Sequence, residues 1–226
     1  MVPLTDTDWI ALALFLAIWN AYAVLVDRVP RIQRQSVMAS MDEHRRRWMR
    51  AALTRDNRIA DISAIGNLMS STSFLANTSI FILGGLLAML SSPELGRRVL
   101  AAMPFAAAPS GDAGWEMRII LMLVIFVNAF FQLTWALRQF NYCSILVGAM
   151  GPGTGPAQLL QAEVAAKIAN RAARHFNSGL RGYYFGLAAL AWLLHPLALI
   201  LATLLVVREL YRREFRSVVH EALSEA

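Results

Sequence analysis

Long apolar runs alternate with polar, arginine-rich stretches along the 226 residues of the chain. Four runs approach or exceed the length of about 20 apolar residues that a helix needs to cross a bilayer. They cover about Trp9–Val26, Ile65–Leu90, Met117–Leu137 and Tyr183–Val207. The pattern therefore predicts an all-α, multi-pass transmembrane helical bundle with four spans in a single membrane domain.

Two segments between the runs, 27–61 and 138–182, are predicted to lie in the cytoplasm as amphipathic helices. In the second, apolar residues recur every four positions, at Leu160, Val164, Ile168, Ala172 and Phe176. Pro156 suits a first helical turn, and Gly179 suits the end of the helix. We also expect the third span to continue as a helix to about Met150, well beyond a hydrocarbon core of about 30 Å.

The distribution of arginine predicts the orientation. Segment 27–61 carries nine arginines, whereas loop 91–116 carries only Arg97 and Arg98, so the first is expected inside and the second outside. The acidic N-terminus is then outside. Because no basic region precedes the first apolar run, we expect that run to be retained as a helix and not removed as a signal peptide.

The C-terminal tail conflicts with this orientation. Four crossings place it outside, yet the stretch VVRELYRREFRS, residues 206–217, holds four arginines. Alternatively, His195-Pro196 breaks the fourth run into a re-entrant hairpin that returns the tail to the cytoplasm. The sequence leaves both arrangements open.

Composition narrows the class of protein. Hydrophobic residues make up 57% of the chain and charged residues 16%, against about 45–50% and about 25% in soluble domains. Cys143 is the single cysteine, and the four histidines lack zinc-ligand spacing, so no metal site or cofactor is expected. No G-x-S-x-G, HExxH or nucleotide-binding motif is present, which favours a protein that is not an enzyme.

Polar residues interrupt the second and third runs at helical spacing. Steps of three and four connect the polar positions of the second run, and the third run repeats the pattern. These residues are Asn67, Ser70, Ser71, Asn77, Thr78, Asn128 and Gln132, with Asn20 inside the first run. Since polar groups that face lipid are penalised, we expect them to turn toward a common interior. They either join helices by hydrogen bonds or line a hydrated path for an ion or small polar solute.

The fourth run contains two further candidates. His195 lies about halfway along it, where it is either a structural residue at the Pro196 kink or a gating group. Gly182 and Gly186 form a GxxxG pair, which is typical of a helix-packing or dimer face.

Two groups of arginines are candidate anion contacts. Arg45, Arg46, Arg47 and Arg50 flank Trp48 and are expected to contact phospholipid headgroups, not nucleic acid, because they lie close to a predicted span. Arg138, Arg171, Arg174 and Arg181 gather at the inner ends of the third and fourth spans. They serve either as positive-inside anchors or as a site for an anionic solute or headgroup.

Three stretches resemble a known family. They are RDNRIADISAIGNLMSSTSFLANTSIFILGGLL, FFQLTWALRQFNYCSILVGAM and HFNSGLRGYYFGLAALAWLLHPLALILATLLVVRELYRREFRS, of which TWALRQFNY and FNSGLRGYYF are the most specific parts. The chain from about Arg55 to Ser217 is similar to the bacterial and plant membrane proteins catalogued as domain of unknown function 599. The resemblance implies a helical integral membrane protein and brings no catalytic residue, substrate or cofactor.

The sequence thus supports two hypotheses for a multi-pass protein of the bacterial cytoplasmic membrane. The first is a passive conduit for an ion or small polar solute, formed by a homo-oligomer because four helices are few to enclose a path. The second is a membrane scaffold that binds anionic lipid or partner proteins through its arginine-rich cytoplasmic face.

Overall fold

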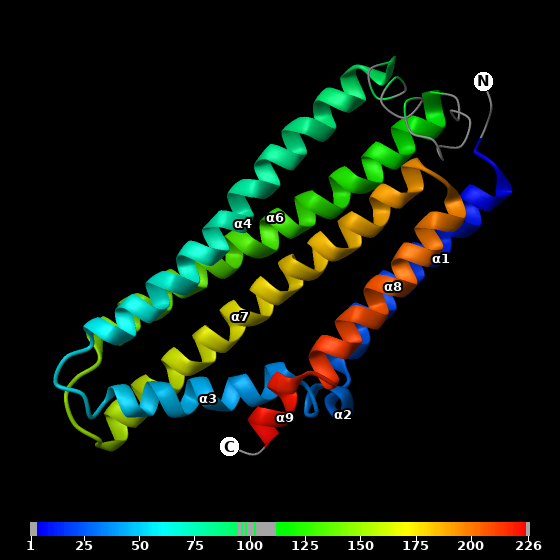
Figure 1. The fold of residues 1–226 in the computed structure, drawn as a ribbon. Helices are drawn as coiled ribbons and strands as arrows, with labels where there is room; N and C mark the ends of the chain where they lie inside the picture. The colour runs from blue at the N-terminus through cyan, green and yellow to red at the C-terminus, as the bar shows by residue number, and fades with distance from the viewer. Residues whose placement is uncertain (1–3, 95, 97, 99–101, 103–111, 225–226) are drawn as a thin grey trace.

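The computed structural model describes residues 4–94, 96, 98, 102 and 112–224, and these fold into helices joined by short connections (Figure 1). The predicted outer loop lies largely outside these residues, including the side chain of Arg97 and positions 103–111. The helices are α1 (Asp6–Arg28), α2 (Pro30–Gln33), α3 (Val37–Ala52), α4 (Ile59–Ser91), α6 (Asp112–Ala149), α7 (Pro156–Leu190), the 3-10 turn η1 (Ala191–Leu193), α8 (Pro196–Phe215) and α9 (Val218–Ser224).

Local sequence signals set the helix ends. The Thr5 side chain caps α1 and Asp8 caps it reciprocally, and the Ser36 hydroxyl accepts from the backbone of Ala39 at the start of α3. Prolines occupy the first turns of α2, α7 and α8, where a missing N–H costs no hydrogen bond. Gly153 adopts a φ of 100° in the linker between α6 and α7, a left-handed conformation that favours glycine.

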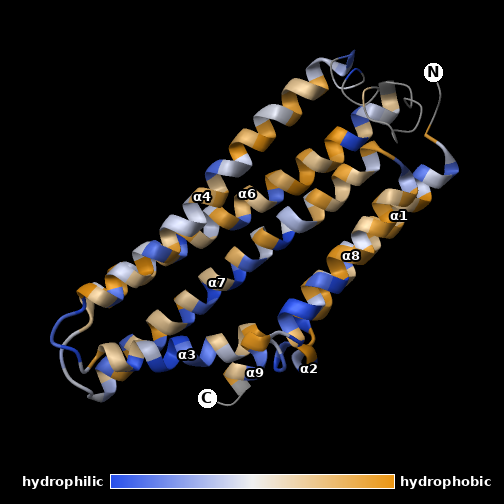
Figure 2. Cartoon of the chain, viewed as in Figure 1, coloured by the Kyte–Doolittle hydropathy of each residue, from blue (hydrophilic) through white to orange (hydrophobic). Residues whose placement is uncertain are grey.

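Within the residues that the structure describes, three helices are long and apolar enough to cross a membrane, namely α1, α4 and α6. They contain the first three predicted spans. The predicted extension of the third span is confirmed, because α6 continues to Ala149. Its 38 residues give a length of about 57 Å. Figure 2 shows hydrophobic residues along these helices and hydrophilic residues gathered on α3 and the lower part of α8.

The fourth predicted span differs from a continuous helix. Helix α7 runs from Pro156 through Gly179 to Leu190, so Gly179 does not end a helix. The chain then reverses at His195-Pro196, and α8 returns beside α1 toward the α3 end (Figure 1). Pro196 cannot continue a helix from the preceding turn, which explains the break. The reversal brings the arginine-rich tail to the α3 end, where Glu214 accepts a hydrogen bond from the backbone N–H of Met38 at 3.2 Å.

The long helices pack side by side, with α6 between α4 and α7, and with α1 and α8 on the far side of α7 (Figure 1). Helix α3 crosses α7 near the N-terminal end of α7.

Close packing of α6 and α7 depends on glycine. A Cβ at Gly182 would lie 2.9 Å from the Ala129 Cβ, and one at Gly186 would lie 2.7 Å from the Phe126 Cζ. The GxxxG pair therefore packs two helices of one chain.

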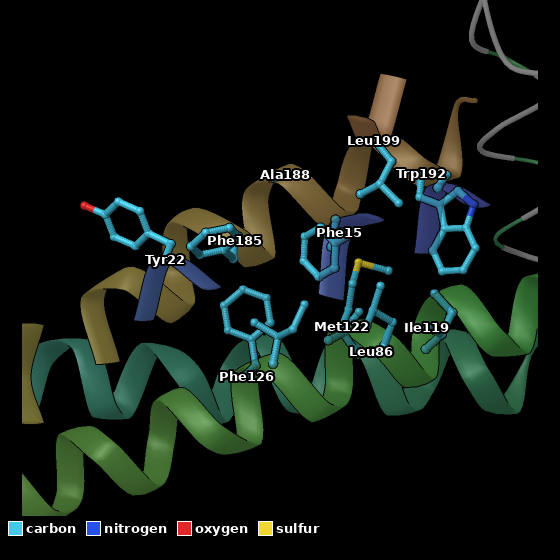
Figure 3. Close-up of a cluster of buried hydrophobic side chains, with 14 of the residues drawn as sticks. Phe15, Tyr22, Leu86, Ile119, Met122, Phe126, Phe185, Ala188, Trp192 and Leu199 are labelled. Atoms are coloured by element: carbon cyan, nitrogen blue, oxygen red, sulfur yellow. The ribbon is translucent and has the colours of Figure 1, made fainter. Parts of the chain in front are cut away.

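Two hydrophobic clusters form the interior of the described part of the chain. The first joins α1, α6, α7 and α8 and is rich in aromatic rings, among them Phe15, Phe126, Phe185 and Trp192 (Figure 3). The second lies where α3 and the ends of α4, α6 and α7 meet, and much of it is alanine from α7. Leu160 and Val164, on the predicted apolar stripe of α7, are exposed. The small alanine side chains, not the larger apolar ones, bring α7 close to its neighbours.

Candidate functional site

The polar face of α4 lies on the outer surface of the chain. Asn67, Ser70, Ser71 and Asn77 are exposed and Thr78 is half-buried. Within the part of the chain that the structure describes, neither carboxamide of this face has a hydrogen-bond partner. The expectation that this face turns toward the same interior as the polar residues of α1 and α6 is therefore wrong for the single chain.

Several hydroxyl groups of α4 are satisfied within the helix. Ser71, Thr72, Thr78 and Ser79 each donate to the carbonyl oxygen four residues earlier, at 2.7–3.1 Å. This local bonding lets a helix carry many Ser and Thr residues without leaving their hydroxyl donors unpaired. Tyr183 of α7 also reaches α4, with its hydroxyl 2.8 Å from the Ser79 hydroxyl and 2.5 Å from the Leu75 carbonyl.

The polar residues of α1 and α6 do come together, along one side of α7. They line two cavities of about 330 Å³ and about 620 Å³ that share Ser178. The upper cavity lies among α1, α6 and α7 and is lined by residues that include Trp19, Asn20, Tyr22, Asn128, Arg181 and Phe185. The lower cavity, toward the α3 end, is lined by residues that include Arg28, Gln132, Lys167, Arg171, Arg174 and His175. We call the two cavities together the α7 groove.

One face of α7 gives the groove its charge. Lys167, Arg171, Arg174, Ser178 and Arg181 follow one another at steps of four and three, so they lie on one side of the helix. Two of the arginines have carboxylate partners. Arg174 lies 2.6 Å from Asp42 of α3, and Arg181 lies 2.5 Å from Asp27 at the end of α1. Three of the four arginines in the second predicted group thus lie at the groove.

Arg138, the fourth, is directed elsewhere. Its guanidinium is exposed, donates to the Tyr142 hydroxyl at 2.5 Å and lies over the Trp135 ring. Gln132 does face the groove, where its Oε1 is 2.7 Å from Nδ1 of His175. The groove therefore combines amide, imidazole and cationic groups at one place.

The arginines of α3 are paired with carboxylates. Arg45 lies 3.0 Å from Asp42, Arg46 contacts both Glu43 and Glu163, Arg47 contacts Glu43, and Arg50 contacts Glu163, the last three at 3.6–3.8 Å. Burial lowers the pKa of the Arg45 guanidinium, and the Asp42 carboxylate opposes that shift. Exposed pairs at the longer of these distances contribute little to stability. Asp42, Glu43 and Glu163 offset part of the positive charge of the four arginines.

Trp48, which lies between Arg47 and Arg50 on α3, faces the protein interior. Its indole N–H donates to the carboxylate of Asp61 at 2.6 Å, and Arg55 pairs with the same oxygen. Arg58 donates to the carbonyl of Ala52 and to Met150 at the end of α6, at 3.1 and 2.5 Å. These bonds hold the loop between α3 and α4 against the end of α6.

His195 occupies the bend between η1 and α8. It is exposed, and its Nδ1 accepts a hydrogen bond from the backbone N–H of Leu197 at 3.1 Å, so it caps α8. The position expected halfway along a span is wrong, because that span is divided at this residue. A capping role follows from the geometry.

A buried charged cluster was not predicted. Asp8 accepts from Arg118 at 3.1 Å and from the indole N–H of Trp192 at 2.9 Å, which ties α1, α6 and η1 together. Arg118 stands at the start of an apolar run, and an arginine there is a signal that could have suggested a buried partner. Among the described ranges, no group of three or more His, Cys, Asp or Glu residues is placed to hold a metal ion.

Helices of bilayer length that pack around an apolar interior define the chain as a helical protein with the features of a membrane protein. The chain belongs to the family described as protein of unknown function, DUF599, which matches residues 10–219. The match extends the resemblance from Arg55 back to the first apolar run. No curated protein and no solved structure matches the chain.

Proposed function

We propose that the protein is a non-enzymatic protein of the bacterial cytoplasmic membrane that works as a homo-oligomer. The α4 faces of neighbouring copies meet and line a passive path for an ion or small polar solute. The observation that carries this proposal is the outward, unpartnered position of the Asn67 and Asn77 carboxamides on a helix long enough to span a bilayer.

The physical argument begins with the cost of polar groups in lipid. A carboxamide that faces hydrocarbon without a hydrogen bond is penalised by several kcal/mol. A second copy removes this penalty, because a carboxamide carries both a donor and an acceptor and can pair with its own counterpart. Copies related by an axis along the membrane normal bring the same residue of each chain face to face where that residue lies close to the axis. Asn77 would then meet Asn77 of the next copy.

The remaining residues of the face have shapes that suit such packing. Phe74 and Phe81 are 69% and 80% exposed and project from the helix, whereas a Cβ at Gly84 or Gly85 would meet no atom within 4 Å. Large and small side chains that alternate along one face can interdigitate with a second helix. Since α4 packs mainly along α6, most of its circumference is available for this contact.

The proposal is tested by cross-linking and by flux. In a Cys143→Ala background, Asn77→Cys is expected to give an oxidant-dependent dimer in membranes. Purified protein in liposomes is expected to pass an ion or small solute, and Asn67→Leu or Asn77→Leu should reduce that flux. Asn141→Leu, which removes an exposed carboxamide from the end of α6, should leave it unchanged.

The possible outcomes separate the hypotheses. Cross-linking without flux above protein-free liposomes would refute the conduit and leave the carboxamides as contacts between copies. Absence of the cross-link would refute both. The competing scaffold predicts salt-sensitive binding to anionic vesicles that is lost when the charges of Arg45–Arg50 are reversed, with no flux.

A further inference from the structure

We infer that the α7 groove binds an anionic glycerophospholipid, with the phosphate in the lower cavity and an acyl chain along the upper cavity. The site uses none of the α4 residues, so this inference is independent of the proposed oligomer. It rests on the charge of the lower cavity, on the walls of the upper cavity and on Ser178, which lines both.

The lower cavity is rich in cations. Five basic side chains line it, from Arg28, Arg46, Lys167, Arg171 and Arg174, against the single carboxylate of Asp27. That carboxylate is already engaged by Arg181. Two of the five, Arg46 and Arg174, are paired with carboxylates outside this lining. The unpaired positive charge therefore comes from Arg28, Lys167 and Arg171. The excess of positive charge at the rim of the apolar helices is the electrostatic environment that attracts an anionic headgroup.

Three of these basic groups are available to a ligand. Arg28, Lys167 and Arg171 make no hydrogen bond or ion pair with any residue that the structure describes. Arg174 is instead held by Asp42, so it stays at the wall of the cavity. A guanidinium can bind two phosphate oxygens through parallel N–H groups, and a lysine adds a point charge. The chemistry that fits is therefore a phosphate ester or free phosphate.

The upper cavity distinguishes a lipid phosphate ester from free phosphate. Its walls include the apolar side chains of Trp19, Val124 and Phe185, and Ser178 lines both this cavity and the lower one. Asn20 and Asn128 are exposed at its edges, so the cavity opens at the side of the chain. A phosphate held below would place an attached acyl chain directly against these walls. A free phosphate would use only the lower cavity, and we therefore assign the groove to a lipid.

The test compares two lipids with the same acyl chains. The purified full-length protein is titrated with phosphatidylglycerol or phosphatidylcholine, and binding is followed by native mass spectrometry. Phosphatidylglycerol is expected to bind more tightly, and Lys167→Gln with Arg171→Gln should weaken that binding about tenfold or more because two charge-assisted contacts are lost. Arg208→Gln, at an exposed α8 arginine outside both cavities, serves as the matched control and should not weaken it.

A second variant tests the acyl-chain part of the site. Asn128→Trp places a bulky ring at the edge of the upper cavity and should weaken phosphatidylglycerol binding while binding of inorganic phosphate is unchanged. Since Asn128, Lys167 and Arg171 are exposed, circular dichroism of all variants should match the parent. Equal binding of the two lipids, or equal effects of the double variant and Arg208→Gln, would overturn the inference. Unchanged lipid binding in Asn128→Trp, with phosphate competing fully, would reassign the cavity to a free anion.

Discussion

The buried ion pair between Asp8 and Arg118 should contribute strongly to the stability of the helix bundle. One carboxylate oxygen of Asp8 accepts from both Arg118 and Trp192, and the two charged side chains are only 4% and 7% exposed. The pair connects the first helix, the third long helix and the turn before α8. Arg118→Met removes the positive partner and leaves the carboxylate in a site that solvent barely reaches.

The magnitude follows from the burial. Removing one partner of a buried pair costs about 3–5 kcal/mol because the remaining charge is uncompensated. For a protein of this size each kcal/mol lowers the melting temperature by about 2–4 °C, so Arg118→Met should lower it by about 6–20 °C. Hydrogen bonds to Asp8 from Thr5 and Trp192 persist, which favours the lower half of that range.

The assay is thermal unfolding followed by circular dichroism for Arg118→Met, Asp8→Asn and the double variant. The double variant leaves no unpaired formal charge and should lose less stability than the sum of the single variants. Arg212→Met, which removes an exposed partner of Glu209, is the control and should shift the transition little. Strictly additive losses, or a shift for Arg118→Met no larger than the control, would refute the reasoning.

Two other contacts give simple predictions. Gly182→Leu should lower the free energy of unfolding by about 1–3 kcal/mol, because the new side chain overlaps α6. Gly148→Leu, whose side chain meets open space, should not lower it. Thermal unfolding measures both variants. Tyr183→Phe should cost about 0.6 kcal/mol and raise hydrogen exchange in α4 near Leu75, whereas Tyr142→Phe should leave α4 exchange unchanged. Equal exchange in the two tyrosine variants would contradict the proposed link between α7 and α4.

The sequence predicted the apolar helices because length and hydropathy are local properties. Trp9–Val26, Ile65–Leu90 and the long third helix all appear where expected. The fourth run was harder to interpret, since two short apolar helix segments joined at His195-Pro196 have the same hydropathy as one continuous span. The conflict raised by the arginine-rich tail was the signal for a break in this run. The structure shows the break at His195-Pro196 and places the tail at the α3 end, and a cytoplasmic tail stays a prediction.

The sequence did not predict which way the polar side chains of each helix face. Helical spacing groups Asn67 with Asn77 and Asn128 with Gln132, but it does not say which neighbour each helix face meets. For Asn128 and Gln132, the neighbour is set by the glycines of α7. These glycines bring α7 against α6 and leave the α7 groove beside the contact. Arg118 and Asp8 are 110 positions apart, and their pairing depends on the tertiary arrangement of helices that the sequence alone does not fix.

The turn at His195-Pro196 also determines whether the number of long helices that run end to end is odd or even. It sends the last long helix back, so the start of α1 and helix α9 lie at opposite ends of the molecule (Figure 1). If the long helices lie in a bilayer, reporter enzymes fused to the two termini must occupy different compartments. A chain without this turn would place both reporters in the same compartment.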